Sequence, residues 1–75
     1  MNSIEEFAIP KERVAVVIGP NGATKKEIET RTKAKVHIDS KNGDVTIEAE
    51  DAVIAMKAGN IVRAMGRGFS PEHAM

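Results

Sequence analysis

The stretch Val17-Ile18-Gly19-Pro20-Asn21-Gly22 decides how this chain can fold. Its last four residues predict a turn by composition, because Gly-Pro and Asn-Gly pairs interrupt both helices and strands. The residues before it, 11–18, leave two alternatives open. Their β-branched side chains suit a buried strand, whereas Pro10 at the start and a glycine at the end suit a short helix. Local sequence does not decide between the two.

Residues 23–32, which follow the turn, predict a helix with a mostly charged face. Two pairs of opposite charges stand four residues apart, a spacing that brings side chains together on a helix. These pairs are Lys25 with Glu29 and Glu27 with Arg31. Ile28 is the one large apolar residue of the segment, so only a narrow stripe of this helix is expected to be buried.

Residues 35–49 predict a β-hairpin. Asn42-Gly43 favours a two-residue type I′ turn, in which both residues have positive φ. A hairpin centred there has an apolar face that pairs Val36 with Ala49, Ile38 with Ile47 and Ser40 with Val45. Its polar face pairs His37 with Glu48, Asp39 with Thr46 and Lys41 with Asp44. Because the turn and the alternation agree, we expect this register.

Three further segments complete the pattern. Residues 5–9 predict a short strand that is closed by a proline. Asp51 is a good N-cap for a helix that runs to Met65, with apolar residues at helical spacing. Gly59 lies inside that helix without a reason visible in the sequence. Ser70-Pro71 predicts the start of another helix.

The composition indicates one small domain of ordinary globular character. The chain has 75 residues, 11 basic and 11 acidic side chains, and 41% hydrophobic residues. It has no cysteine, which excludes disulfides, thiolate zinc sites and a thiol nucleophile. No apolar run reaches the roughly 20 residues of a membrane span, and the acidic start lacks the features of a secretory signal. We therefore expect a cytoplasmic protein with no membrane partner.

The balanced total charge hides an uneven distribution. Residues 11–35 carry seven basic and three acidic side chains, whereas residues 36–60 carry two basic and five acidic ones. Such a split can give a protein one side for an anionic partner and another side for solvent. Ordinary solvated helix faces would produce the same split, so charge alone does not identify a partner.

Three groups of residues together resemble the KH domain family: the stretch 17–22, Ile28 in the following helix, and Thr32-Lys33-Ala34-Lys35-Val36-His37-Ile38. That family's signature is an aliphatic-Ile-Gly-x-x-Gly turn between two helices, followed by a strand that opens with Lys-Ile or Lys-Val. The resemblance implies an α+β type I KH fold in the order β-α-α-β-β-α. Three helices would pack on one face of a three-stranded antiparallel sheet. Residues 11–18 would form the first helix, and residues 1–68 would form the domain.

The resemblance also implies a site for single-stranded RNA of about four nucleotides. The loop that would hold the sugar–phosphate backbone consists of Gly19, Pro20, Asn21 and Gly22, with no Cβ at its two corners. The helix after the loop would direct its positive dipole end at the same place. Phosphates would be contacted by Lys11, Arg13, Lys25 and Lys26. Bases would lie on an aliphatic floor, with their edges read partly by the backbone of residues 36–38. The floor would be formed by Val14, Val17, Ile18, Ile28, Val36 and Ile38.

Three positions depart from the family pattern. Many KH loops have a basic residue between the glycines, whereas Pro20 and Asn21 are neutral, so phosphate contacts would depend more on Lys25 and Lys26. Lys33 stands where the family usually has glycine at the end of a helix. A non-glycine residue is therefore expected at positive φ there.

The C-terminal residues 61–74 resemble the segment that joins the two KH modules of the archaeal and eukaryotic pre-ribosomal RNA-processing KH proteins. The similarity is strongest in Arg-Ala-Met-Gly-Arg-Gly-Phe-Ser-Pro-Glu, residues 63–72. Those proteins help the 3′ end of small-subunit rRNA to mature beside a PIN-domain endonuclease. The resemblance therefore implies three partners: an rRNA precursor, the pre-ribosomal small subunit and that endonuclease. Residues 69–75 would then form a tail that begins a linker helix to a second module.

Three other interpretations remain. The first is a KH-like module whose groove and last helix bind protein while the loop is vestigial. The second is the phosphate-binding loop of an NTPase, which residues 19–26 resemble. Thr24 and Lys26, however, stand where that motif needs a glycine and a Ser or Thr. In the third, residues 19–22 are only a turn between two helices.

No group of residues predicts catalysis or metal binding. His37 is expected to form a surface pair with Glu48 across the hairpin. His73 has no second ligand at metal spacing, and no nucleophile with a matching base is found. We therefore expect a binding protein without an enzymatic activity, a metal or a cofactor.

Overall fold

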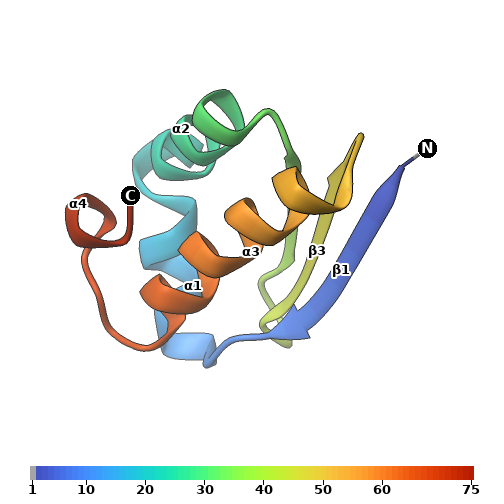
Figure 1. Cartoon of the computed structure of the whole chain (residues 1–75). Helices are drawn as coiled ribbons and strands as arrows, with labels where there is room; N and C mark the ends of the chain where they lie inside the picture. Colours follow the sequence, from blue (N-terminus) through green and yellow to red (C-terminus); the bar gives the residue numbers. More distant parts are fainter. Residues whose placement is uncertain (1) are drawn as a thin grey trace.

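All the helices of this protein lie on one face of a three-stranded antiparallel sheet (Figure 1). The computed structural model describes residues 2–75, and its elements follow the expected order. They are β1 (Ser3–Ala8), α1 (Lys11–Ile18), the 3₁₀ turn η1 (Pro20–Gly22), α2 (Ala23–Thr32), β2 (Lys35–Asp39), β3 (Asp44–Ala49), α3 (Ala52–Gly66) and α4 (Pro71–Ala74). The α+β arrangement of the type I KH fold is confirmed, with α4 as an additional short helix. Within residues 2–75, no helix has the length and apolar character that crossing a bilayer requires.

Residues 11–18 form a helix, which confirms the prediction from the KH resemblance and excludes the strand that the local sequence leaves open. The Gly19 N–H donates to the Ala15 carbonyl at 2.9 Å, a helical spacing that a strand cannot have. Val14 and Val17 lie on the buried side of this helix. Their packing outweighs the preference of β-branched residues for strands, because tertiary contacts supply most of the stability of a short helix.

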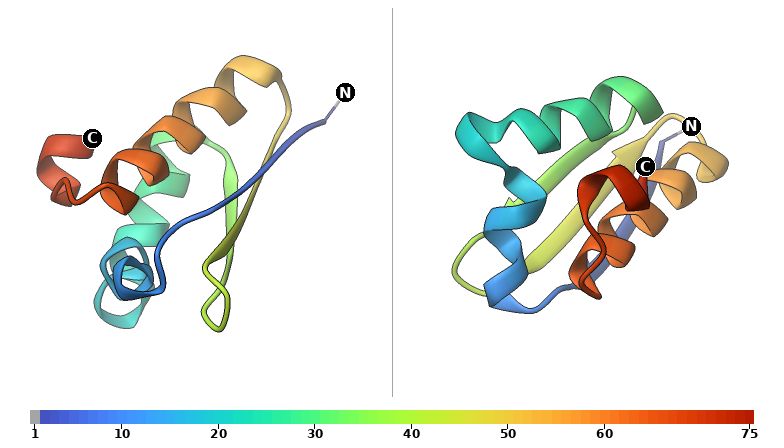
Figure 2. Two further views of the ribbon diagram at one scale, coloured as in Figure 1. Left: turned by 90° about the horizontal axis from the view of Figure 1, so that it is seen from below. Right: turned by 90° about the vertical axis from the view of Figure 1, so that its left-hand side faces the viewer.

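The central strand of the sheet is β3, and the strand order is β1-β3-β2. β1 pairs with β3 from Ser3 opposite Ala49 to Ala8 opposite Asp44. The helices cover the inner face of this sheet and leave the outer face open, as the two views of Figure 2 show. Both β1 and β2 are edge strands, so one backbone edge of each has no neighbouring strand.

The hairpin loop is longer than the sequence predicts. β2 and β3 pair Val36 with Ile47 and Ile38 with Val45, a register two residues away from the expected one. The expected two-residue turn is therefore wrong, and residues 40–43 form the loop. A type I′ turn would need positive φ at both Asn42 and Gly43, but of these two only Gly43 has it, at 79°.

Asp39 explains the longer loop. Its Oδ1 accepts a hydrogen bond from the Lys41 N–H at 2.9 Å, and its carbonyl accepts one from the Gly43 N–H at 2.8 Å. Asp side chains stabilise turns by bonds of this kind. Because the register changes by two residues, every side chain keeps its face of the sheet. His37 therefore still approaches Glu48, with Nε2 3.9 Å from Oε2, although it lies opposite Thr46.

One hydrophobic core fills the space between the helices and the inner face of the sheet. Burial of each large apolar side chain stabilises the fold by about 1.5–3 kcal/mol relative to exposure. Ile28 is the one buried residue of α2, as its narrow apolar stripe predicts. The largest completely buried side chains are Val17, Ile28, Val36, Val45, Ile47, Val62 and Met65.

Gly59 leaves room for an ion pair between α3 and β1. A Cβ at this position would lie 2.7 Å from Glu5 Oε1 and 3.0 Å from Nη1 of Arg63. Arg63 Nη2 donates to Glu5 Oε1 at 2.9 Å, and its guanidinium lies 4.2 Å from the centre of the Phe7 ring. The glycine costs α3 about 1 kcal/mol of helix propensity. The partly buried ion pair and cation–π contact that it permits give a reason for Gly59 that the sequence does not show.

Arg13 joins α1 to the end of α3. Its Nε donates to the Met65 carbonyl at 2.8 Å, and its Nη2 donates to the Phe69 carbonyl at 3.2 Å. The last carbonyls of a helix have no partner inside the helix, and a cation there also interacts favourably with the helix dipole. Beyond this point Phe69 is 53% exposed, whereas Ala74 and Met75 pack against the core.

We predict that Gly43→Ala destabilises the protein by about 3 kcal/mol or more. Gly43 has a φ of 79°, and a Cβ on it would overlap the Ile9 carbonyl oxygen, which belongs to the backbone and cannot move aside. Gly22→Ala is the matched control, because φ is 76° there but a Cβ meets nothing within 4 Å. The control is expected to cost about 1–2 kcal/mol. Urea unfolding followed by circular dichroism measures both, and equal losses would contradict the prediction.

We predict that Arg13→Lys lowers the free energy of unfolding by about 1–2 kcal/mol, because an ammonium cannot reach both carbonyls that the guanidinium bonds. Arg31→Lys is the matched control. Arg31 forms an exposed ion pair with Glu27 at 2.9 Å, and such pairs contribute little to stability. Urea unfolding of the two variants side by side tests this, and an Arg13→Lys protein as stable as the control would disprove the role of Arg13.

Candidate nucleic-acid interface

The corner between α1 and α2 is made of residues with left-handed backbone. φ is 76° at Gly19, 55° at Asn21 and 76° at Gly22. A Cβ on Gly19 would lie 2.7 Å from the backbone nitrogen of Thr24, so only glycine fits there. A Cβ on Gly22 would meet nothing within 4 Å. The backbone at the second glycine is therefore open to close approach from outside.

This corner lies at the outside of the molecule, and no other element covers it in either view of Figure 2. Pro20 and Asn21 are exposed. The loop does not pack under other residues, which would have excluded a ligand. The single 3₁₀ turn η1 is closed by the bond from the Gly22 N–H to the Gly19 carbonyl at 3.1 Å.

The start of α2 is suited to an anion. Its N-cap, Gly22, has no side chain to bond the N–H groups of the first turn, of which that of Ala23 donates to the Pro20 carbonyl, and the turn contains no acidic residue. The positive end of the helix dipole and these N–H groups favour a negative charge nearby. Lys25 and Lys26 follow at once, the first half-buried and the second exposed. Both are close enough to the loop in sequence to contact a phosphate held there.

The other two predicted phosphate contacts lie elsewhere. Lys11 is exposed at the first turn of α1, about 10 Å along the helix from its end at Ile18. Arg13 is committed to the carbonyls of Met65 and Phe69. Its expected role as a phosphate contact stays a prediction, and the structure gives Arg13 the role of a link between α1 and α3. No local sequence pattern marks this role, because the carbonyls are more than fifty positions away in the chain.

Glu29 does not pair with Lys25 as the sequence predicts. Among the ion pairs of residues 2–75, only the second expected helical pair is found, Glu27 with Arg31 at 2.9 Å. Glu29 instead turns toward the sheet, and its Oε2 accepts a hydrogen bond from the Val36 N–H at 2.8 Å. This contact leaves the Lys25 ammonium available to a ligand. It could not be predicted locally, because the spacing of four residues favours the helical pair.

Most of the predicted groove floor belongs to the core. Val17, Ile28 and Val36 are 0% exposed and Val14 is 5% exposed, so these side chains cannot form a contact surface. They support the site from beneath. Ile18 at the end of α1 and Ile38 in β2 are partly exposed and pack on the edge of the core. They are the two predicted floor residues that a ligand can reach.

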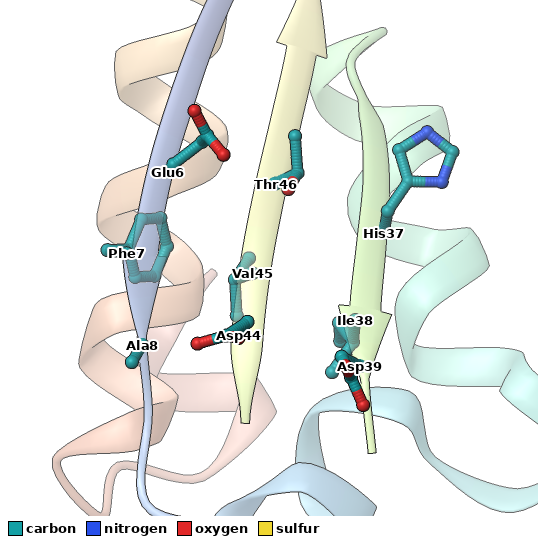
Figure 3. Close-up of a pocket in the computed structure, with 9 residues that line it drawn as sticks. All are labelled: Glu6, Phe7, Ala8, His37, Ile38, Asp39, Asp44, Val45 and Thr46. Carbon is teal, nitrogen blue, oxygen red and sulfur yellow. The ribbon is translucent and has the colours of Figure 1, made fainter. Parts of the chain in front are cut away.

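A wide hollow lies on the outer face of the sheet and not at the loop (Figure 3). It measures about 800 Å³ and lies over the middle and lower parts of all three strands. Glu6, Thr46 and His37 form one row across the sheet, and the carboxylates of Asp39 and Asp44 lie below them. An anionic ligand would be repelled from this face. Among residues 2–75, no group of three or more His, Cys, Asp or Glu side chains is arranged to hold a metal ion.

Comparison with known sequences identifies the domain type. The KH domain family matches residues 4–63 of this chain. A KH domain-containing protein of Methanocaldococcus jannaschii is 48% identical over 77 residues, which is 97% of this chain and 34% of that protein. A polyribonucleotide nucleotidyltransferase of Trichodesmium erythraeum is 42% identical over 65 residues, which is 87% of this chain and 9% of that enzyme. This chain thus spans about a third, or less, of the length of these two relatives.

Comparison with solved structures agrees with the sequence matches. Dim2p from Pyrococcus horikoshii superimposes with a TM-score of 0.93 at 54% identity, covering 96% of this chain and 46% of Dim2p. A complex of a/eIF2alpha, aDim2p and rRNA from the same organism contains a chain that matches with a TM-score of 0.93 at 53% identity, over 97% of this chain and 44% of that chain. By its sequence, its strand and helix order and its Gly-x-x-Gly corner, this chain belongs to the KH domain family, a family of RNA-binding domains.

Proposed function

We propose that this domain binds single-stranded RNA through residues 19–22 and the adjoining edge of β2. KH domains hold about four nucleotides, with the Gly-x-x-Gly loop against the sugar–phosphate backbone. The open space around the Gly22 Cβ position is the observation that carries the proposal. It lets a nucleic-acid backbone approach the peptide chain at the start of α2, where the positive end of the helix dipole favours a negative charge.

The bases would lie between α1 and the free edge of β2. Ile18 and Ile38 supply partly exposed apolar surface on the two sides. Apolar contact can replace aromatic stacking, which this chain cannot offer because it has no Tyr or Trp. β2 is an edge strand, so its outward N–H and C=O groups can bond base edges. The domain would bind RNA without changing it chemically.

The relatives support a role in small-subunit rRNA processing. The Pyrococcus structure that matches over 97% of this chain is a complex with rRNA and a/eIF2alpha. The RNA of this domain would accordingly be an rRNA precursor. Besides this RNA, its partners would be the pre-ribosomal small subunit and a PIN-domain endonuclease. A Dim2p-like protein longer than this chain would carry that role as a whole.

We predict that the double variant Pro20→Asp/Asn21→Asp weakens RNA binding at least about tenfold, because two carboxylates would face the phosphates. The fold should persist, since both positions are exposed and Asp tolerates the left-handed backbone of residue 21. Fluorescence anisotropy with a labelled single-stranded RNA measures the affinity, and circular dichroism checks the fold.

The matched control for the loop variant is Val53→Asp/Met56→Asp. It adds the same two charges on α3, where these side chains are 56% and 50% exposed. This variant should bind RNA nearly as the unchanged protein does. If the loop variant also retains its affinity, the loop is vestigial and the alternative of a protein-binding KH module gains support.

We predict that Lys25→Gln and Lys26→Gln each weaken RNA binding and each lower the salt dependence of log K by about 0.7, the value for one phosphate contact on a single strand. Lys57→Gln, an exposed position on α3, is the control and should leave the slope unchanged. Affinity measured over a series of salt concentrations tests this. Slopes that fall equally in all three variants would mean that only total charge matters.

A further inference from the structure

Glu29 occupies the first backbone donor of the β2 edge. Its Oε2 accepts from the Val36 N–H at 2.8 Å in a partly buried position. Because Val36 bonds a side chain of α2, its N–H points away from β3 and toward α2. Residues two apart on a strand direct their N–H groups to the same side. The Ile38 N–H and carbonyl therefore point to that side as well.

The carboxylate of Glu29 has a second oxygen that is free to accept. Oε1 has no hydrogen-bond donor among residues 2–75. Every side-chain oxygen of the half-buried residues that is itself buried has a hydrogen-bond partner, so an oxygen without one is exposed. Oε1 must therefore reach the surface at the seam between α2 and β2. Lys25 lies one helical turn closer to the loop and forms no ion pair with Glu29, so Oε1 can accept a hydrogen bond from a ligand.

Glu29 also differs from the other carboxylate of the same helix. Glu27 lies on the exposed side of α2 and is paired with Arg31 at 2.9 Å. Of these two carboxylates of α2, Glu29 is the one that is fixed by a backbone N–H, that of Val36, and still has an accessible acceptor oxygen. A carboxylate held in this way is a built acceptor beside the edge where base groups would be read.

We propose that Glu29 is a base-specificity residue that selects cytosine or adenine over uracil at the nucleotide next to Val36, an inference that rests on the proposed RNA-binding function. The amino groups of cytosine N4 and adenine N6 donate to a carboxylate. Uracil presents a carbonyl oxygen, O4, in the place where cytosine has its amino group. Two acceptors would then face each other, and neither could be satisfied. The preference arises from this repulsion as well as from the new hydrogen bond.

The test compares oligo(C) with oligo(U), since these pyrimidines differ at the group that Glu29 would read. The unchanged protein should bind oligo(C) about tenfold more tightly than oligo(U), as expected for one good base contact. Glu29→Gln can still accept from the Val36 N–H but offers an amide donor to the base, so the ratio should fall to about twofold or less. Glu27→Gln makes the same charge change outside the site and should keep the ratio of the unchanged protein.

A second measurement does not need RNA. Glu29→Ala removes the partner of the Val36 N–H, so hydrogen exchange at that amide should become at least about tenfold faster, while the Ile47 amide in the central strand should not change. Exchange at Val36 that stays as slow as before would overturn the proposal. So would a cytosine-to-uracil ratio that is equal in Glu27→Gln and Glu29→Gln. Failure of the unchanged protein to bind either oligomer would instead refute the proposed RNA-binding function itself.

Discussion

The contact between Thr24 and the backbone of Gly19 is the constraint on which the rest of this structure depends. No side chain fits between them, so the chain can pass from α1 into α2 only with glycine at that corner. The corner sets the direction of α2. With that direction, Ile28 enters the core and Glu29 reaches the Val36 N–H of the neighbouring sheet edge. One tight turn therefore places both the apolar anchor and the polar contact of a helix that is otherwise charged and exposed.

The two sides of the sheet have different chemistry for a simple reason. Helices cover the inner face, so its side chains are mostly apolar and its Glu5 is paired with Arg63 of α3, whereas the outer face is open and carries Glu6, Asp39 and Asp44 in its hollow. The basic residues Lys25 and Lys26 lie on the helical side, next to the loop. A phosphate backbone is attracted to that side and repelled from the outer face of the sheet. The neutral total charge of the chain thus conceals a polarity that can orient a nucleic acid.

Two charged side chains of this small domain satisfy backbone groups that the secondary structure leaves free. Arg13 bonds the Met65 and Phe69 carbonyls at the end of α3, and Glu29 bonds the free N–H of an edge strand. Helix ends and sheet edges leave such groups without partners, and a domain of this size has few residues to cover them. A charged group makes a stronger hydrogen bond than a neutral one, so it is an efficient partner for an isolated carbonyl or N–H. Glu29 combines this structural role with a position at the β2 edge beside the candidate site.

Local sequence determined the elements with their turns and caps: the glycine corner, the α2 segment and the Asp51 cap that accepts from the Ile54 N–H at 2.9 Å. These features depend on residues within a few positions of one another, so local physical rules predict them. Local rules left residues 11–18 open between strand and helix, and tertiary packing gives the helix that the family resemblance implies. Tertiary structure alone decided that the hairpin shifts by two residues, tied to the end of β1 by the bond from the Ile9 N–H to the Gly43 carbonyl. It also decided that most of the predicted groove floor is core and that Arg13 and Glu29 bond distant backbone groups. The physical reason is that each of these outcomes depends on a partner far away in the chain, which no local pattern contains.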